Sequence, residues 1–252
     1  MKRMIAVVML ALLSTLAHGQ TRIAVASNFE STAQELADAF YERTEERIIL
    51  VSGSSTSMAR QVRQGTGFDA FISGDMEHAR QVAEEGGGDL DTLFVFGIGR
   101  LVLLADENPD AGVSDPETLL REESYRALAV PDDRESAYGK AAEQVLDKLF
   151  RSRFAVRDTV EATSAGQAFS FMRSGSVDLG FVPRSLVVQE GIDESRYWLI
   201  PQDMHVELRQ AAIMLEDGSE TAQRFLDFIR DDEAAHRIIT EAGYALPQDD
   251  ES

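Results

Sequence analysis

The sequence contains no cysteine in its 252 residues. This absence excludes disulfide bridges, thiolate metal sites and a cysteine nucleophile, and it excludes the lipidated cysteine that tethers some exported proteins to a membrane. The stability of the fold must therefore come from buried apolar side chains. The chain is long enough to form one large core or two modest ones.

Basic residues, and lysine above all, are scarce. Aspartate and glutamate together number 44, against 24 lysines and arginines, and the only lysines are Lys2, Lys140 and Lys148. A formal charge of −20 repels phosphate backbones, so we expect no nucleic-acid partner. An acidic, lysine-poor surface also fits a high-salt habitat.

The only long apolar run lies in the first twenty residues. Two basic residues precede a mostly apolar stretch from Ile5 to Leu16, and the small-x-small pattern Ala17-His18-Gly19 follows it. This pattern predicts a secretory signal peptide over residues 1–19, too short to span a bilayer. We expect a soluble, monomeric protein in the periplasm, without a lipid anchor, and a disordered acidic tail at residues 248–252.

Short apolar runs alternate with helical patterns along the rest of the chain. This alternation predicts an α/β fold with mainly parallel strands. Apolar residues repeat with helical spacing at residues 33–40, 58–62, 76–83 and 138–149. The expected strands are Ile23 to Ala26, Ile48 to Val51, Ala70 to Ile72, Leu101 to Leu104, Ala127 to Val130, Leu179 to Val182 and Ala211 to Leu215.

Four hydroxyl-rich stretches each stand where a strand or extended run is followed by a helix. Helix starts expose unpaired N–H groups, and the starts that follow parallel strands gather at one edge of a sheet, so they predict a small-anion site. Helix capping is the alternative, because Ser27 with Glu30 and Ser164 with Gln167 fit the capping-box pattern. The four stretches are Ser27-Asn28, Gly53-Ser54-Ser55, Ser136-Ala137-Tyr138 and Thr163-Ser164-Ala165.

Motifs for other chemistries are missing. There is no Gly-x-Ser-x-Gly, no His-Glu-x-x-His, no phosphate-binding loop and no dinucleotide fingerprint. We therefore predict no catalytic residue, no cofactor and no metal-ion ligand. Scattered histidines are expected at the surface, and paired acids in turns or on solvated faces. These residues are His78, His205 and His236, and Asp132 with Asp133 and Asp69 with Asp75.

Three motifs occur in the first part of the chain, and two more follow. The first three are Ile23-Ala24-Val25-Ala26-Ser27-Asn28-Phe29, then Gly53-Ser54-Ser55 before Met58-Ala59-Arg60-Gln61-Val62, then Asp69-Ala70-Phe71-Ile72-Ser73-Gly74-Asp75. The other two are Tyr138-Gly139-Lys140-Ala141-Ala142 and Asp178-Leu179-Gly180-Phe181-Val182. Together they make the chain, from about residue 21 to 246, resemble the periplasmic molybdate-binding proteins of ABC transporters.

This resemblance implies an α/β fold of the two-lobe type II periplasmic binding protein class. Two hinge crossings are expected, near Gly97 to Leu101 and near His205 to Gln210. Residues 20–98 and 206–247 would form lobe 1, and residues 99–205 lobe 2. The lobes would close on molybdate, and also on tungstate, and the closed form would dock on the permease of an ABC importer.

The resemblance also assigns the ligand-binding residues. Carried over position by position, the family's oxyanion donors fall on Ser27 with the adjoining Asn28, on Ser55, on Tyr138 and on the backbone N–H of Ala165. Many members have a small residue in place of Tyr138 and a tyrosine donor in place of Pro183, whereas this chain has the reverse. Because a proline side chain cannot donate, Tyr138 is expected to supply the phenol.

Three alternatives remain open. The ligand could be another oxyanion such as sulfate or phosphate, and a protonated phosphate would need an acceptor, for which Asp132 and Asp133 are the candidates. A serine hydrolase would use Ser27 or Ser55 as nucleophile, but the motifs supply no base. A sensor domain would report the ligand to a partner protein.

Overall fold

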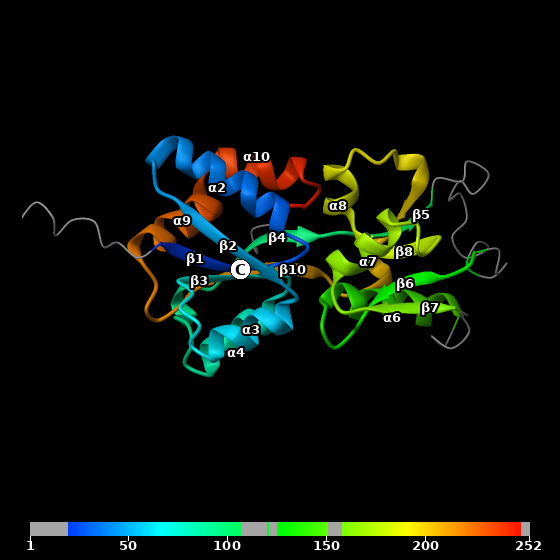
Figure 1. Cartoon of the computed structure of the whole chain (residues 1–252), viewed down its shortest axis with the longest axis horizontal. Coiled ribbons are helices and arrows are strands. Elements are labelled where there is room, and N and C mark those ends of the chain that lie inside the picture. The colour runs from blue at the N-terminus through cyan, green and yellow to red at the C-terminus, as the bar shows by residue number, and fades with distance from the viewer. Residues whose placement is uncertain (1–19, 107–119, 121–124, 151–157, 248–252) are drawn as a thin grey trace, which may run out of the picture.

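The computed structural model describes residues 20–106, 120, 125–150 and 158–247. The predicted signal peptide and acidic tail lie outside the described residues. Figure 1 shows two α/β bodies side by side, each built on a five-stranded sheet, and we call them lobe 1 and lobe 2. The expected fold class is confirmed.

The sheet of lobe 1 has the strand order β2-β1-β3-β10-β4. Strands β1, β2 and β3 are parallel, whereas β10 is antiparallel to both β3 and β4. The bounds are β1 Thr21–Ala26, β2 Ile48–Gly53, β3 Ala70–Ser73, β4 Phe94–Gly99 and β10 Leu208–Met214.

Helices cover both faces of this sheet because successive side chains of β1 point to opposite faces. Ile23 and Val25 pack with α2, α9 and α10, whereas Ala24 packs with α3 and α4 (Figure 1). The helices are α2 Glu30–Thr44, α3 Ser55–Arg63, α4 Met76–Glu84, α9 Glu220–Asp231 and α10 Glu233–Glu241, with a 3₁₀ turn at Leu90–Thr92.

The sheet of lobe 2 has the order β7-β6-β8-β5-β9. Helix α6 packs on one face, and α7 and α8 pack on the other. The strands are β5 Leu101–Ala105, β6 Leu128–Pro131, β7 Thr159–Ala162, β8 Leu179–Pro183 and β9 Tyr197–Leu199. The helices are α6 Ala137–Phe150, α7 Ala165–Arg173 and α8 Arg184–Gln189, with 3₁₀ turns at Glu194–Arg196 and Gln202–Met204.

The chain passes between the two sheets twice. Only Arg100 separates the end of β4 from the start of β5, and residues 200–207 separate β9 from β10. The boundaries of the lobes at residues 98/99 and 205/206 stay a prediction.

All seven expected strands are present, but the expectation of mainly parallel strands is wrong. Half of the strand pairings are antiparallel, and they all involve β5 or β10. These two strands enter their sheets directly from the crossings and not through a helix, so no right-handed crossover makes them parallel to their neighbours.

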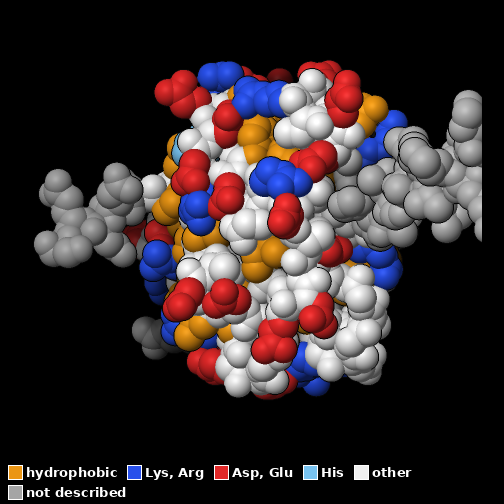
Figure 2. Space-filling view, turned by 90° about the vertical axis from the view of Figure 1, so that its left-hand side faces the viewer, with side chains coloured by type: hydrophobic (Ala, Val, Ile, Leu, Met, Phe, Trp, Pro, Cys, Tyr) orange, Lys and Arg blue, Asp and Glu red, His pale blue; other side chains and the backbone are white. Residues whose placement is uncertain are grey.

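The end of lobe 1 that is turned toward the viewer in Figure 2 carries acidic side chains interspersed with basic ones. Ion pairs of lobe 1 include Arg43 with Asp232 at 2.6 Å and Arg230 with Asp227 at 2.7 Å. Among the described residues, no helix has the length and apolar character needed to cross a membrane.

Each lobe has its own buried core, and a single deletion tests the core of lobe 2. Leu103 is fully buried on β5, so Leu103→Ala should destabilise the protein by about 2 to 5 kcal/mol through lost burial and a cavity. Leu90→Ala is the control, because Leu90 is 54% exposed. Urea denaturation followed by circular dichroism measures both. Equal stability of the two variants would contradict this assignment of the core.

Candidate anion-binding site

The lobe 1 half of the site is formed by the segments that follow β1, β2 and β3. Asn28 and Ser55 are both buried, and Gly74 lies between them. A Cβ atom on Gly74 would lie 2.7 Å from Asn28 Oδ1 and 3.0 Å from Ser55 Oγ. The Gly74 N–H donates to Ser55 Oγ at 3.1 Å, which leaves the Ser55 hydroxyl hydrogen for another acceptor.

The lobe 2 half comes from the starts of α6 and α7. Ala165 is the first residue of α7, and a Cβ on the next residue, Gly166, would lie 3.2 Å from Ser27 Oγ. Tyr138, on α6, is buried, and its phenol oxygen lies so close to Gly99 that a Cβ on Gly99 would clash with it. The same Cβ would lie 3.0 Å from Gln210 Nε2, and Gln210 is bonded to Asn28. All five predicted residues therefore belong to one continuous group between the lobes.

Four donors in this group have no protein partner. Within the part of the chain that the structure describes, no hydrogen bond of normal geometry satisfies the backbone N–H of Asn28, Ser55 or Ala165, or the phenol of Tyr138, which lies beside the side chains of Asn28 and Tyr244. All four residues are buried. Burial raises the pKa of the Tyr138 phenol well above its ordinary value, so the phenol keeps its proton. None of the predicted site residues is charged, so the group presents neutral donors to whatever lies between the lobes.

The side chain of Asn28 is already engaged. Its Nδ2 donates to Gln210 Oε1 at 2.7 Å and to the Tyr244 hydroxyl at 3.2 Å. The Asn28 backbone carbonyl accepts from the Tyr244 hydroxyl at 2.7 Å and, across the lobes, from Ser185 Oγ at 3.1 Å. Burial raises the pKa of Tyr244 to about 12. The backbone N–H is therefore the donor that Asn28 has free.

Sequence reasoning missed Gln210, Tyr244, Ser185 and Gly74, because all of them join the group through long-range contacts. The one local signal is Gln210, an amide that directly precedes the apolar run Ala211 to Leu215. A buried amide in such a strand needs partners, which points to a built polar group.

Helix capping explains one of the two serines that fit the capping-box pattern. Ser164 caps α7 by accepting from the Gln167 N–H at 3.1 Å, as predicted. The capping prediction for Ser27 is wrong, because α2 begins only at Glu30 and Phe29 occupies the cap position without a side-chain bond. The Ser27 hydroxyl consequently has no hydrogen-bond partner among the described residues.

The lobes touch on both sides of the group, so the structure is a closed form. On one side the Lys140 ammonium pairs with Glu77 at 2.7 Å, and Thr56 Oγ1 donates to the Arg134 carbonyl at 3.3 Å. On the other side Gln189 Nε2 donates to Thr32 Oγ1 at 2.8 Å. Donors from the two lobes are thereby held facing one another.

Comparison with known proteins agrees with this architecture. The family model of the bacterial extracellular solute-binding proteins matches residues 21–245. The chain belongs to this family.

Individual relatives and solved structures show which members of the family this chain resembles. The molybdate-binding protein ModA of Rhodobacter capsulatus is 32% identical over 230 residues, which cover 90% of this chain and 89% of the relative. The periplasmic molybdate-binding protein of Azotobacter vinelandii superposes with a TM-score of 0.83 at 29% identity, covering 90% of this chain and all of that one. The sulfate-binding protein SubI of Mycobacterium tuberculosis, with a TM-score of 0.73 and 14% identity over 92% of this chain and 88% of its own, shares the fold. The resemblance to molybdate-binding proteins is confirmed.

The expectation that all three histidines lie on the surface is wrong for two of them. The side chains of His78 and His205 are largely buried. His78 Nδ1 lies 2.8 Å from an Asp75 carboxylate oxygen, and its Nε2 lies 3.0 Å from Thr56 Oγ1. His205 is buried beside the second crossing, where burial lowers its pKa. Both ring nitrogens of His78 have polar partners, whereas only Nδ1 of His205 has one, the Val206 carbonyl at 2.6 Å. The described residues hold no group of three or more His, Cys, Asp or Glu that could bind a metal ion.

Asp132 has a structural partner. Its carboxylate accepts from Arg134 Nη2 at 2.9 Å and from the Arg134 N–H at 2.8 Å. These hydrogen bonds lower the pKa of Asp132 to about 2. The carboxyl is therefore ionised and paired at neutral pH.

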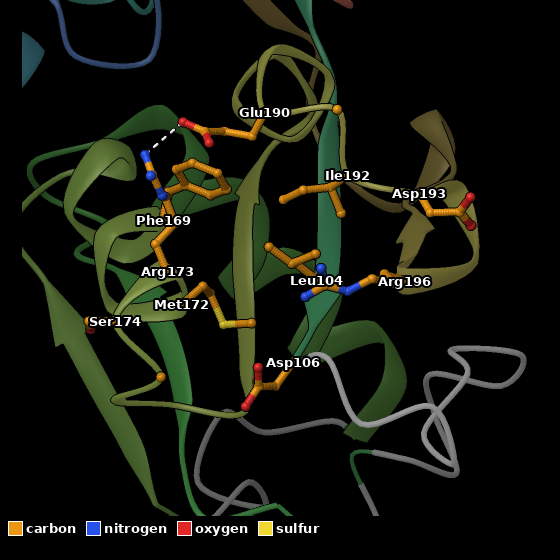
Figure 3. Close-up of a pocket in the computed structure, with 12 residues that line it drawn as sticks. Leu104, Asp106, Phe169, Met172, Arg173, Ser174, Glu190, Ile192, Asp193 and Arg196 are labelled. Carbon is orange, nitrogen blue, oxygen red and sulfur yellow. Dashed lines mark hydrogen bonds and ion pairs between the residues drawn. The ribbon is translucent and has the colours of Figure 1, made fainter.

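A cavity of about 640 Å³ opens on lobe 2, away from the anion-binding group (Figure 3). Phe169, Met172 and Ile192 form its apolar wall, and an ion pair between Arg173 and Glu190 at 2.6 Å lies on its rim. It contains none of the predicted donors. A cluster of buried, unpaired donors is a stronger sign of a ligand than open space, so we place the candidate site between the lobes.

Substitution of Gly99 by alanine tests whether Tyr138 packs against Gly99 when the lobes are closed. A methyl group on Gly99 would occupy the space of the phenol oxygen, so Gly99→Ala should displace Tyr138 and keep the lobes further apart. Gly97→Ala, on the same strand, is the matched control, because its added carbon would have ordinary contacts of 3.5 Å or more. Small-angle X-ray scattering should give a larger radius of gyration for Gly99→Ala only. Identical scattering of both variants would rule out this packing.

Proposed function

We propose that the protein is the periplasmic solute-binding component of an ABC importer, and that it binds molybdate, and also tungstate, between its lobes. The proposal rests on four donors of buried residues, three backbone N–H groups and the Tyr138 phenol, that have no partner among the described residues. Buried N–H groups are almost always hydrogen-bonded, so a ligand rich in acceptors completes them.

The ligand would be held without a positively charged side chain. The hydroxyls of Ser27 and Ser55 add two donors to the four, and hydrogen bonds to an ionised acceptor are stronger than neutral ones. Two of the helix starts, those of α3 and α7, also direct the positive ends of their dipoles toward this space. A tetrahedral dianion offers an acceptor in every direction from which these groups come.

Closure follows from the same arrangement. Ser27, Asn28 and Ser55 belong to lobe 1, and Tyr138 and Ala165 to lobe 2, so an anion bonded to both sets favours the closed form by its differential affinity for it. The closed form would then dock on the membrane permease. The predicted lobe boundaries, the signal peptide and the monomeric state belong to this proposal.

Two observations favour molybdate over phosphate. The relatives named for molybdate binding cover 90% of the chain at 32% and 29% identity. A protonated phosphate needs an acceptor, and Asp132, one of the two candidates, is paired with Arg134. Tungstate has nearly the size and charge of molybdate, so the same donors would hold it.

A hydrolase is disfavoured by the surroundings of the two serines. Ser55 Oγ accepts from the Gly74 N–H. His78 is the histidine closest to Ser55 along the chain, and its ring is bonded to Thr56 and Asp75. No base is bonded to Ser27 or Ser55 within the described residues, so neither is activated as a nucleophile.

Isothermal titration calorimetry of the mature chain against molybdate, tungstate, sulfate and phosphate tests the proposal. Molybdate and tungstate should bind in a one-to-one ratio, and the melting temperature should rise with their concentration. Binding of sulfate or phosphate in preference to molybdate would overturn the assignment.

Removal of a serine hydroxyl should weaken binding. Ser27→Ala and Ser55→Ala should each cost about 1 to 3 kcal/mol of molybdate affinity, because each removes a donor to a buried anion. The melting temperature of the ligand-free protein should change little for Ser27→Ala, since its hydroxyl bonds to no described protein group. Parent-like affinity in both variants would place the ligand elsewhere.

Tyr138→Phe isolates the phenol. The ring keeps its volume and packing while the donor is lost, so affinity should fall by about 1 to 3 kcal/mol for a charge-assisted bond. The empty protein should be as stable as the parent or more so, because a buried hydroxyl without a partner is removed. Unchanged molybdate affinity would show that the ring only packs.

A further inference from the structure

Gln210 occupies a central position in the molecule. It lies on β10, just after the second crossing, and it is fully buried. Its Oε1 accepts from Asn28 Nδ2 at 2.7 Å, and its Nε2 donates to the carbonyls of Gly74 at 3.0 Å and Leu208 at 2.9 Å. Both amide hydrogens are therefore used inside the protein, and none is left for a ligand.

These bonds connect the two donor segments of lobe 1. One segment is held through Asn28, and the other through Gly74, whose N–H in turn donates to Ser55 Oγ at 3.1 Å. The Gln210 amide is thus the shared partner of segments that lie 182 and 136 residues away in the sequence. Through them it orients the Asn28 backbone and the Ser55 hydroxyl.

Gln210 also adjoins the donor from lobe 2. The point where a Gly99 Cβ would lie is 3.0 Å from Gln210 Nε2, and the Tyr138 phenol oxygen is within clashing distance of the same point. Gly99 ends the strand that enters the first crossing, and Gln210 follows the second. The amide therefore lies where both crossings and both halves of the site meet.

We propose that Gln210 is the positioning residue of the anion site, a role that rests on the function proposed above. It does not touch the anion. It fixes the donors by engaging the side-chain amide of Asn28 and by holding the carbonyl of Gly74, the residue whose N–H donates to Ser55 Oγ. An apolar residue would bury more cheaply in this strand, so the amide is retained for its bonds.

Gln210→Glu gives this role a signature that a purely structural residue lacks. The shape is kept, but the carboxylate cannot donate to Gly74 and Leu208, and its charge lies beside the bound anion. The molybdate Kd should rise about tenfold or more near pH 8.5. As the pH falls toward about 6, the buried carboxyl takes up a proton, regains one donor and loses its charge, so affinity should recover in part. The parent should show no such pH dependence.

Two further variants complete the experiment. Gln144→Glu is the matched control. Gln144 lies on α6 outside the donor group, and its Oε1 accepts from the Val206 N–H at 2.8 Å. The molybdate affinity of this variant should follow that of the parent at every pH. Gln210→Met removes the amide without adding charge, and its affinity should fall by a pH-independent factor of about ten. If Gln210→Glu does not fold, Gln210→Met decides the question.

The outcomes separate this inference from the proposed function. If the parent binds no molybdate, both proposals fall. If the parent binds and Gln210→Glu binds equally well, or loses affinity by the same factor at every pH, Gln210 only supports the fold and the inference is overturned. Parent-like affinity of Gln210→Met would overturn it as well.

Discussion

The constraint on which this structure depends is that a buried N–H group must be hydrogen-bonded. In the described part of the molecule, strand ladders meet it within the two sheets, and the serine caps Ser54 and Ser164 meet it at the starts of α3 and α7. Between the lobes the protein leaves three such N–H groups and one phenol unsatisfied. A site of this kind is costly when empty and stable when an acceptor-rich ligand fills it.

Neutrality of the donors is the second feature that shapes the site. Because Tyr138 is kept protonated by burial and the other donors are hydroxyls and peptide groups, the donor set does not change its charge across the physiological range. Such a set distinguishes ligands by the number and direction of their acceptors and by size. The acidic surface, with its net charge of −20, makes no contribution to attraction of an anion, so affinity must arise locally.

Much of the fold could be predicted from the sequence because local patterns of apolar residues determine its strands and helices. Buried strands such as β5 and β8 are continuous apolar runs, and α2 and α6 have clear apolar faces. The strands β4, β7 and β9 were not predicted, since β4 contains two glycines, β7 is partly exposed and β9 has three residues. The helices α8, α9 and α10 were also not predicted.

The candidate site could be predicted only in part. Its donors lie at helix starts, which local sequence reveals, and the resemblance to molybdate-binding proteins selected among them. What holds them in place could not be predicted, because Gln210, Tyr244 and Ser185 reach Asn28 across 157 to 216 residues of sequence. The failed cap at Ser27 has the same origin, since the adjoining Asn28 is held by the distant residues Gln210 and Tyr244 and α2 begins only at Glu30.

A crystal structure of the molybdate complex, with diffraction data collected at the molybdenum absorption edge, tests the central claim most directly. We expect one strong anomalous peak between the lobes, with the anion oxygens within hydrogen-bond distance of the hydroxyls of Ser27, Ser55 and Tyr138 and of the N–H groups of Asn28 and Ala165. A peak in the cavity of lobe 2, or an anion between the lobes that leaves these donors unpaired, would contradict it.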